Sequence, residues 1–341
     1  MKNRTEYLGI DIGGAHLKII GLDKNGVVIF AEYFSCRVWE GTTFLSKLFK
    51  DLNNLFSRKI LKCAITMTAE MCDNFKNRKE GVKKIIKLCQ ILKFKKYFYV
   101  NNTQIFKKKP KYCEFISMNW HSIGRFLENK VDNAILLDFG STTTDLICIK
   151  NNKIANEYFD DCSRINNYEL KYTGFTRTPL YGITDEIKSN NNVRKVIPEN
   201  FSESSDIYRV LNKLDKKNDV DKTSDNRGKS KKESLIRISR NFGFDYKIQL
   251  KKEMENICNQ ISLIQLNTIY EAMNKLKRKF QIKKPIIIVS GIGQDVLSDY
   301  LKKKRIKTIY LHEFLKKSRL NKKASFHAPA LSVALILQKL K

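Results

Sequence analysis

The chain has 341 residues, enough for one large domain or two lobes, and its hydrophobic fraction of 42% excludes wholesale disorder. No run approaches the roughly 18 apolar residues that a membrane-spanning helix needs. The formal net charge of +30 would suit nucleic-acid binding. However, the basic runs at 107–111 and 302–305 lie far apart, and no nucleic-acid-binding motif accompanies them. We therefore expect lysines spread over solvated faces, and neither a nucleic acid nor a membrane as partner.

The first 128 residues have the pattern of a β-meander followed by alternating helices and strands. Strand-like segments at 7–11, 17–22 and 27–32 are separated by Gly13-Gly14 and by the hairpin signal Asn25-Gly26. Apolar residues at helical spacing predict a helix over 44–56, and a strand at 63–67, a helix at 79–92 and a strand at 97–100 follow. This order predicts a mixed sheet with crossover helices, which forms a first lobe at 1–128.

The same pattern restarts in the second half of the chain. Strands are expected at 134–138, 143–150 and 153–158, with a glycine turn after the first of them. This repetition predicts a duplicated lobe at 129–341. Between about 159 and 245 the sequence is polar and lacks clear periodicity, which is typical of a functional or disordered insertion. Helical spacing resumes over 246–280, a strand covers 285–289, and a helix at 327–340 closes the chain.

The cysteines indicate a reducing environment. The eight of them are scattered along the chain without a Cys-x-x-Cys pair, and several lie in apolar strand or helix patterns. Such residues are typically reduced, buried thiols. Because the N-terminal residues also lack the apolar core of a signal peptide, we expect a cytoplasmic protein.

Two glycine turns carry the expected chemistry. Asp11 ends the first strand of one lobe and Asp138 ends the matching strand of the other, and glycines follow both. Glycines let backbone N–H groups approach phosphate oxygens, and an aspartate at a strand end can hold Mg²⁺. We therefore predict that Asp11 and Asp138 face each other across one cleft as metal ligands. The expected phosphate-binding residues of the turns are Gly13, Gly14, Gly140, Ser141, Thr142 and Thr143.

A third turn, Ser290 to Gly293, follows a β-branched run and precedes a helix. It is either a simple strand-to-helix turn or a contact for a nucleotide base or ribose. The arrangement of the three turns resembles the actin/hexokinase/Hsp70-like ATPase superfamily. That resemblance implies an α/β fold of two duplicated RNase H-like lobes, here with a polar insertion in the second lobe.

Further blocks resemble one branch of the hydantoinase/oxoprolinase-like family, the tetrahydromethanopterin-linked one-carbon transfer pathway proteins. One of these blocks is Tyr172-Thr173-Gly174 followed by Arg177-Thr178-Pro179. Other matches are Gly9 to Lys18, Thr66 to Glu70 with Arg78 to Val82, Asn119-Trp120, Asp138 to Asp145, Ser205 to Arg209, and Thr223 to Ser230. The resemblance covers nearly the whole chain. Ala69, Phe139 and Asn226 depart from it, where the family usually has glycine, a small aliphatic residue and glycine.

The resemblance implies a transferase of methanofuran biosynthesis, or of a bacterial analogue. Archaeal members of the branch join an (aminomethyl)furanyl-methyl diphosphate to tyramine or γ-glutamyl-tyramine, and these small molecules are the implied partners. The furfuryl carbon would lose diphosphate while the phenol oxygen attacks, so the leaving group needs electrostatic support. Mg²⁺, the glycine turns and four cations are expected to supply it: Lys18, Arg177, Arg227 and Lys229.

The acceptor phenol needs a general base, because its reference pKa is about 10. Asp138 and Asp145 are the candidates, and the sequence does not choose between them. Arg227 and Lys229 flank Gly228, a composition that suits a diphosphate but is not a Walker A loop. Trp120 and Tyr172 are expected to pack in the core rather than to stack on the substrate.

Two other classes of protein fit the same fold. An ATP-dependent kinase or a hydantoinase/oxoprolinase-type amide-ring hydrolase would use Ser290 to Gly293 for adenosine, and a non-enzymatic ATP-gated binding protein would do the same. ATP binding separates these classes from a transferase that needs only diphosphate and Mg²⁺. The branch-specific blocks favour the transferase.

Overall fold

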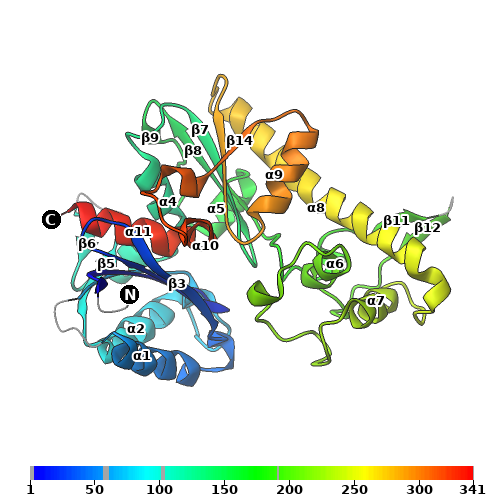
Figure 1. Ribbon diagram of the computed structural model, residues 1–341, viewed down its shortest axis with the longest axis horizontal. Helices are drawn as coiled ribbons and strands as arrows, with labels where there is room; N and C mark the ends of the chain where they lie inside the picture. The colour runs from blue at the N-terminus through cyan, green and yellow to red at the C-terminus, as the bar shows by residue number, and fades with distance from the viewer. Residues whose placement is uncertain (1–3, 57–60, 101–103, 190–191, 341) are drawn as a thin grey trace. The chain divides into compact units, whose positions relative to one another are not determined.

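The computed structural model describes residues 4–56, 61–100, 104–189 and 192–340. The chain packs into two compact units, whose elements are labelled in Figure 1. Unit 1 comprises residues 1–134, 147–160 and 309–341, and unit 2 comprises residues 135–146 and 161–308. The predicted division into two duplicated lobes at residue 128 is based on repetition within the sequence. The division into compact units does not test it, so it stays a prediction.

Unit 1 contains a six-stranded sheet with the order β3-β2-β1-β4-β5-β6. β1 pairs antiparallel with β2 and parallel with β4, so the predicted meander and crossover are confirmed. The strands are β1 (Tyr7–Ile12), β2 (His16–Leu22), β3 (Val28–Ser35), β4 (Lys62–Met67), β5 (Lys95–Tyr99) and β6 (Phe106–Lys107).

Helices cover this sheet because apolar residues alternate along its strands. Leu8 and Ile10 of β1 lie in a core with residues of α1 (Thr43–Leu55) and α2 (Arg78–Leu88). Gly9 points the other way, where a Cβ would lie 1.9 Å from the carbonyl oxygen of Ala330 in α11 (Ala328–Lys339). The remaining helices of unit 1 are α3 (Tyr112–Phe115), α4 (Asn119–Leu127) and α10 (Asn321–Ser325), with short 3₁₀ turns at Val38–Glu40, Ala69–Met71, Cys89–Ile91 and Leu311–Phe314.

A second sheet has the order β10-β8-β7-β13-β14, and β9 pairs with β8. Its strands are β7 (Ala134–Phe139), β8 (Thr144–Lys150), β9 (Lys153–Ile154), β10 (Leu170–Lys171), β13 (Ile286–Ser290) and β14 (Thr308–Tyr310). α9 (Gln294–Lys303) follows β13 directly. The predicted strands are therefore confirmed, although β9 ends earlier than the expected residue 158.

The stretch 159–245 is not disordered in its described part, so that interpretation of its polar sequence is wrong; residues 190–191 lie outside the described residues. It forms α5 (Asp161–Asn166), a hairpin of β11 (Glu186–Ser189) and β12 (Asn192–Lys195), α6 (Ser204–Val210) and α7 (Lys231–Arg240). Leu180, Ile207 and Leu235 build a small core there with Met254 and Ile257 of α8 (Lys251–Lys279). The insertion folds because the long helix α8 supplies one wall of this core.

The cysteines and the helices bear on the expected cellular location. The eight cysteines form no disulfide, and five of them are buried, as expected for reduced thiols: Cys36, Cys63, Cys89, Cys148 and Cys258. None of the helices in the described part of the chain combines the length and the apolar composition needed to cross a bilayer. A cytoplasmic location stays a prediction.

Candidate functional site

The first glycine turn holds a buried ion pair. Asp11 is fully buried near the end of β1, and its Oδ2 accepts a hydrogen bond of 2.9 Å from the ammonium group of Lys18. The other carboxylate oxygen, Oδ1, has no hydrogen-bond partner among the described residues. A buried anionic oxygen without a donor is a place where a water molecule or a hard cation binds. Lys18, predicted as a phosphate ligand, is positioned to neutralise Asp11.

The glycines of this turn are fixed by neighbouring backbone. The N–H of Gly13 donates to the carbonyl of His16 at 3.0 Å, and the thiol of Cys36 donates to the carbonyl of Gly13 at 3.3 Å. A Cβ on Gly14 would lie 2.9 Å from the sulfur of Cys72. The turn is therefore tightly packed, and side chains larger than hydrogen are disfavoured in it.

The second glycine turn lies directly against the third. Asp138 is buried near the end of β7, and its Oδ1 accepts a hydrogen bond of 2.7 Å from the hydroxyl of Ser290. The N–H of Gly293 donates to the carbonyl of Phe139 at 2.9 Å. Gly291 has a φ of +87° and would place a Cβ 2.4 Å from the same carbonyl oxygen, so only glycine fits there. Both turns belong to unit 2 and form one structure.

Asp145 is engaged in a buried ion pair. Its Oδ1 lies 2.9 Å from Nη2 of Arg164, and both side chains are almost completely buried. Arg164 also donates to the carbonyl of Glu169 at 3.1 Å. A buried ion pair of this kind holds both side chains in place, because losing either partner would leave the other charge buried and uncompensated. Of the two predicted general bases, Asp145 is therefore the one that lies in a structural ion pair.

The branch-specific segment 172–179 forms a wall of the second glycine turn. The N–H of Phe175 donates to the carbonyl of Gly140 at 2.8 Å, and the N–H of Arg177 donates to the carbonyl of Ser141 at 3.0 Å. A Cβ on Gly174 would lie 2.3 Å from the carbonyl oxygen of Ser141. The glycine and the position of the arginine in this segment are thus explained by its packing on the turn.

Two buried polar side chains support the segment from behind. Nε2 of Gln265 in α8 donates to the carbonyl of Gly174 at 2.8 Å and to the hydroxyl of Thr173 at 2.9 Å. The hydroxyl of Tyr208 donates to Oε1 of Gln265 at 2.8 Å, and its ring lies 4.3 Å from that of Phe175 between centroids. Gln265 was not among the predicted site residues, and its only signal in the sequence is that it is a polar residue on the buried face of a helix.

Buried charges join α6 to α7. Oδ1 of Asp206 accepts hydrogen bonds from Arg209 at 2.8 Å, from Arg237 at 2.7 Å and from Ser234 at 2.8 Å. Arg209 also binds Asp219 with two nitrogens, at 2.6 and 2.8 Å. The block Ser205 to Arg209 is therefore the centre of an ion-pair network that holds the insertion together.

The loop with Arg227 and Lys229 is attached to this network. The ammonium group of Lys229 lies 3.3 Å from Oδ1 of Asp219 and donates to the carbonyl of the same residue at 2.6 Å. The side chain of Arg227 is exposed, and the backbone N–H of this residue donates to the carboxylate of Asp225 at 3.1 Å. Asp225 in turn pairs with Arg237 at 3.1 Å. Packing therefore explains the course of this loop, while both cations remain accessible to solvent.

Glu203 is a candidate residue that sequence analysis missed. It is the N-cap of α6, and an isolated β-bridge pairs it with Pro179 of the branch-specific segment. Burial raises the pKa of its carboxyl group to about 7; the charge of Arg177 opposes the shift, whereas Asp221 adds to it. A strongly shifted carboxyl group with a specific charged partner is typical of functional sites. Its only sequence signal was its place before the block that starts at Ser205.

Two of the three departures from the family pattern, Asn226 and Phe139, have local explanations. Asn226 has a φ of +55°, a left-handed conformation that glycine adopts freely and asparagine tolerates. The ring of Phe139 is fully buried at the third turn, where a Cβ on Gly293 would lie 2.3 Å from it. Trp120 is fully buried, as expected, whereas Tyr172 is 53% exposed, so the prediction that it packs in the core is wrong.

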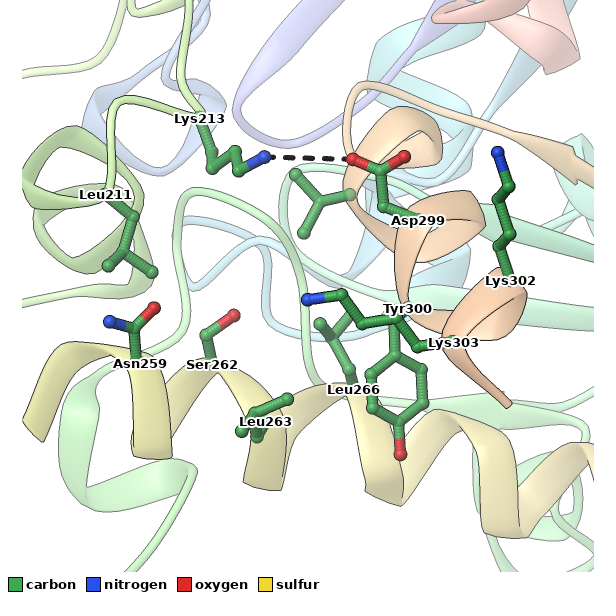
Figure 2. Close-up of a pocket in the computed structure, with 11 residues that line it drawn as sticks. Leu211, Lys213, Asn259, Ser262, Leu263, Leu266, Asp299, Tyr300, Lys302 and Lys303 are labelled. Carbon is green, nitrogen blue, oxygen red and sulfur yellow. Dashed lines mark ion pairs between the residues drawn. The ribbon is translucent and has the colours of Figure 1, made fainter. Parts of the chain in front are cut away.

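A cavity of about 620 Å³ lies in unit 2, between α8, α9 and the residues after α6 (Figure 2). Lys213 and Asp299 point toward each other across its rim, 3.7 Å apart. Leucines and lysines line it together, so it suits a ligand with an apolar part and an anionic group. The lining residues are Leu211, Lys213, Asn259, Ser262, Leu263, Leu266, Val296, Asp299, Tyr300, Lys302 and Lys303. None of the predicted site residues is among them.

Within the described residues, no group of three or more His, Cys, Asp or Glu side chains is arranged to hold a metal ion. Asp11 belongs to unit 1 and Asp138 to unit 2, and a cleft shared by them stays a prediction.

Two known proteins are similar to this chain in sequence. The chain is 30% identical over 97% of both chains to the (4-{4-[2-(γ-L-glutamylamino)ethyl]phenoxymethyl}furan-2-yl)methanamine synthase of Methanocaldococcus jannaschii. It is 33% identical to the synthase of the same name from Methanococcus vannielii, over 62% of this chain and 95% of that protein.

Solved structures share the fold. A ROK family glucokinase from Streptomyces griseus aligns with a TM-score of 0.50 at 12% identity, covering 98% of this chain and 99% of the other. An acetone carboxylase aligns with a TM-score of 0.53 at 9% identity, over 96% and 70% of the two chains. The predicted actin/hexokinase/Hsp70-like fold class is confirmed. Because the model of the hydantoinase/oxoprolinase family matches residues 63–339, the chain belongs to that family.

Proposed function

We propose that this chain is a transferase of methanofuran biosynthesis, in tetrahydromethanopterin-linked one-carbon metabolism. It would join the furfuryl carbon of an (aminomethyl)furanyl-methyl diphosphate to the phenol oxygen of tyramine or its γ-glutamyl derivative, with release of diphosphate. The observation that carries the proposal is the similarity over 97% of both chains to a relative whose name describes the product, a phenoxymethyl-furan ether. The branch-specific segment supports it, because this segment packs on the second glycine turn.

The proposed reaction is a displacement at a carbon that stabilises positive charge. The phenol oxygen forms a bond to the furfuryl carbon, and the bond from this carbon to the diphosphate oxygen breaks with its electron pair on the diphosphate. The furan ring delocalises charge on the carbon, so the departing anion is the group that most needs support. We assign this support to the turn at 140–143 and to Arg177, whose backbone is bound to that turn.

Arg227 and Lys229 are proposed as further cations for the diphosphate. Both side chains are solvent-accessible on one loop, and the pairing of Lys229 with Asp219 orients its ammonium group. Interactions of this kind lower the barrier when they strengthen as the leaving group departs.

Magnesium fits the donors of the first turn. The unpartnered Oδ1 of Asp11 is a suitable hard ligand, and Asp138 is the proposed counterpart in unit 2. Since the described residues offer no larger cluster of ligands, a bound Mg²⁺ would keep most of its waters. When bound, it would supply positive charge to the diphosphate.

The test is an assay of the purified protein with the furanyl diphosphate and tyramine or γ-glutamyl-tyramine. We expect an aryl ether and one diphosphate per turnover, without added nucleotide. Formation of ADP, or strict dependence on ATP, would instead support the kinase or amide-ring hydrolase class. The ratio of rates with the two amines identifies the acceptor.

A further inference from the structure

Two branch-specific blocks meet around residue 203. The N–H of Ser204 donates to the carbonyl of Thr178 at 2.7 Å, and its hydroxyl donates to the carbonyl of Gly174 at 2.9 Å. The N–H of Glu203 itself donates to Oδ2 of Asp206 at 3.3 Å. Segments 172–179 and 204–209 therefore fix the backbone of Glu203 from both sides.

The same contacts bring Glu203 close to the second glycine turn. The positive charge of Arg177 acts to lower the pKa of Glu203, and the backbone N–H of Arg177 donates to the carbonyl of Ser141 in the turn. The side chain of Glu203 is only partly buried, so solvent and small molecules can reach it. The carboxyl group of Glu203 is thus linked to the proposed diphosphate site through a single residue, Arg177.

Four other carboxylates of unit 2 make specific contacts with protein partners. Asp145 pairs with the buried Arg164, and Asp138 accepts the hydroxyl of Ser290. Asp206 and Asp219 share the guanidinium group of Arg209. Protonating any of these would disrupt an ion pair or a hydrogen bond, whereas Glu203 makes no ion pair within 4.0 Å in the described structure.

The electrostatic surroundings of Glu203 favour proton uptake. Burial raises its pKa to about 7, Asp221 and Asp206 add to the shift, and Arg177 and Arg209 oppose it. A carboxylate with that proton affinity is a stronger base than an ordinary glutamate, while it is still ionised at or above neutral pH. Its proton affinity is thus closer to that of a phenol, which is the condition for efficient proton transfer.

We propose that Glu203 is the general base that takes the proton of the acceptor phenol, an inference that rests on the proposed transferase function. The phenol O–H bond breaks toward a carboxylate oxygen of Glu203 as the phenol oxygen bonds to the furfuryl carbon. The electron pair of the broken carbon–oxygen bond leaves with the diphosphate. Glu203 then returns the proton to solvent.

The experiment compares Glu203→Gln with wild type across pH, with Glu199→Gln as matched control. Glu199 is exposed and lies four residues earlier, and only its backbone makes hydrogen bonds in the described structure. We expect kcat/KM of wild type and of the control to rise with pH through an apparent pKa of about 7. Glu203→Gln should lose about 100-fold in rate and lack this limb.

Substrate acidity separates a base from a structural residue. Ring-fluorinated tyramines have more acidic phenols and need less help from a base, so the loss in Glu203→Gln should shrink with them. Glu203→Asp should keep the pH limb at a lower rate. A defect that is equal for every phenol, or a pH limb that survives in Glu203→Gln, would overturn the assignment.

The two proposals fail differently. If wild type makes no ether from the furanyl diphosphate and any phenol, the proposed function is wrong. If wild type makes it and Glu203→Gln matches wild type at every pH, only the role of Glu203 is wrong. Melting curves of the variants exclude misfolding as the cause of a lost rate.

Discussion

Replacing Gly174 by alanine tests whether the branch-specific segment positions the second glycine turn. The added Cβ would lie 2.3 Å from the carbonyl oxygen of Ser141 and 2.5 Å from the carbonyl carbons of Ser141 and Thr142. These are backbone atoms, so no side-chain rotation relieves the clash. Restoring an ordinary contact of 3.4 Å requires the turn and the segment to separate by about 1 Å.

Both stability and rate follow from that displacement. Overpacking of this kind costs about 1–3 kcal/mol of unfolding free energy, which should leave the protein folded. A displacement of about 1 Å in a positioning element can reduce the rate about 100-fold. We therefore expect turnover to fall far more than stability, as measured by diphosphate release and by urea unfolding.

Gly182 supplies the control for this experiment. It follows the same segment, but a Cβ there would meet only Cγ2 of Thr178 at 3.6 Å, an ordinary contact. Gly182→Ala should keep wild-type turnover. If Gly174→Ala also keeps it, the segment does not position the turn, and the structural basis for assigning the diphosphate to residues 140–143 is lost.

Lys229→Ala should lower turnover on the order of 100-fold with little change in KM, because we propose that the lysine acts on the departing diphosphate. Its solvent-accessible pairing with Asp219 contributes less than about 1 kcal/mol, so the melting temperature should hardly change. Glu203→Gln should be more stable than wild type at pH 8 but not at pH 4.5. The folded pKa of Glu203 is raised from 4.5 to about 7, so wild type loses about 3 kcal/mol as pH rises through this window, and equal pH slopes in urea unfolding would contradict this. Duplex DNA should bind weakly at physiological salt, and tight binding with a steep salt dependence would show that the net charge of +30 has a nucleic-acid role.

The sheets could be predicted from the sequence because their signals are local. Alternating apolar residues and the glycine turns placed β1, β2, β7 and β8 within a residue or two. β9 ends early because the side chain of Asn156 accepts the N–H of Cys148 at 2.7 Å, where a longer strand would use its backbone. That substitution of side chain for backbone has no signature in hydrophobic periodicity.

The insertion could not be predicted because it combines a small apolar core with buried ion pairs. Every residue of α6 is buried, including Asp206 and Arg209, which pair with each other. Their further partners lie outside α6, in α7 and in a loop. Polar residues in a sequence indicate exposure unless the partner is known. The contact from Gln265 to Gly174 joins residues 91 positions apart, so neither residue alone predicts the support of the turn.

The buried charges of the insertion also explain why Glu203 keeps a raised pKa beside several cations. Arg209 is neutralised by Asp206 and by a second aspartate, and Arg237 by Asp206 and a third. Arg177 is the cation that most opposes the effect of burial, and Arg209 opposes it less. A diphosphate bound at Arg177 would offset that positive charge, so Glu203 would hold a proton more firmly while the leaving group is in place. The proposed base would in this way be strongest in the complex in which the phenol must lose its proton.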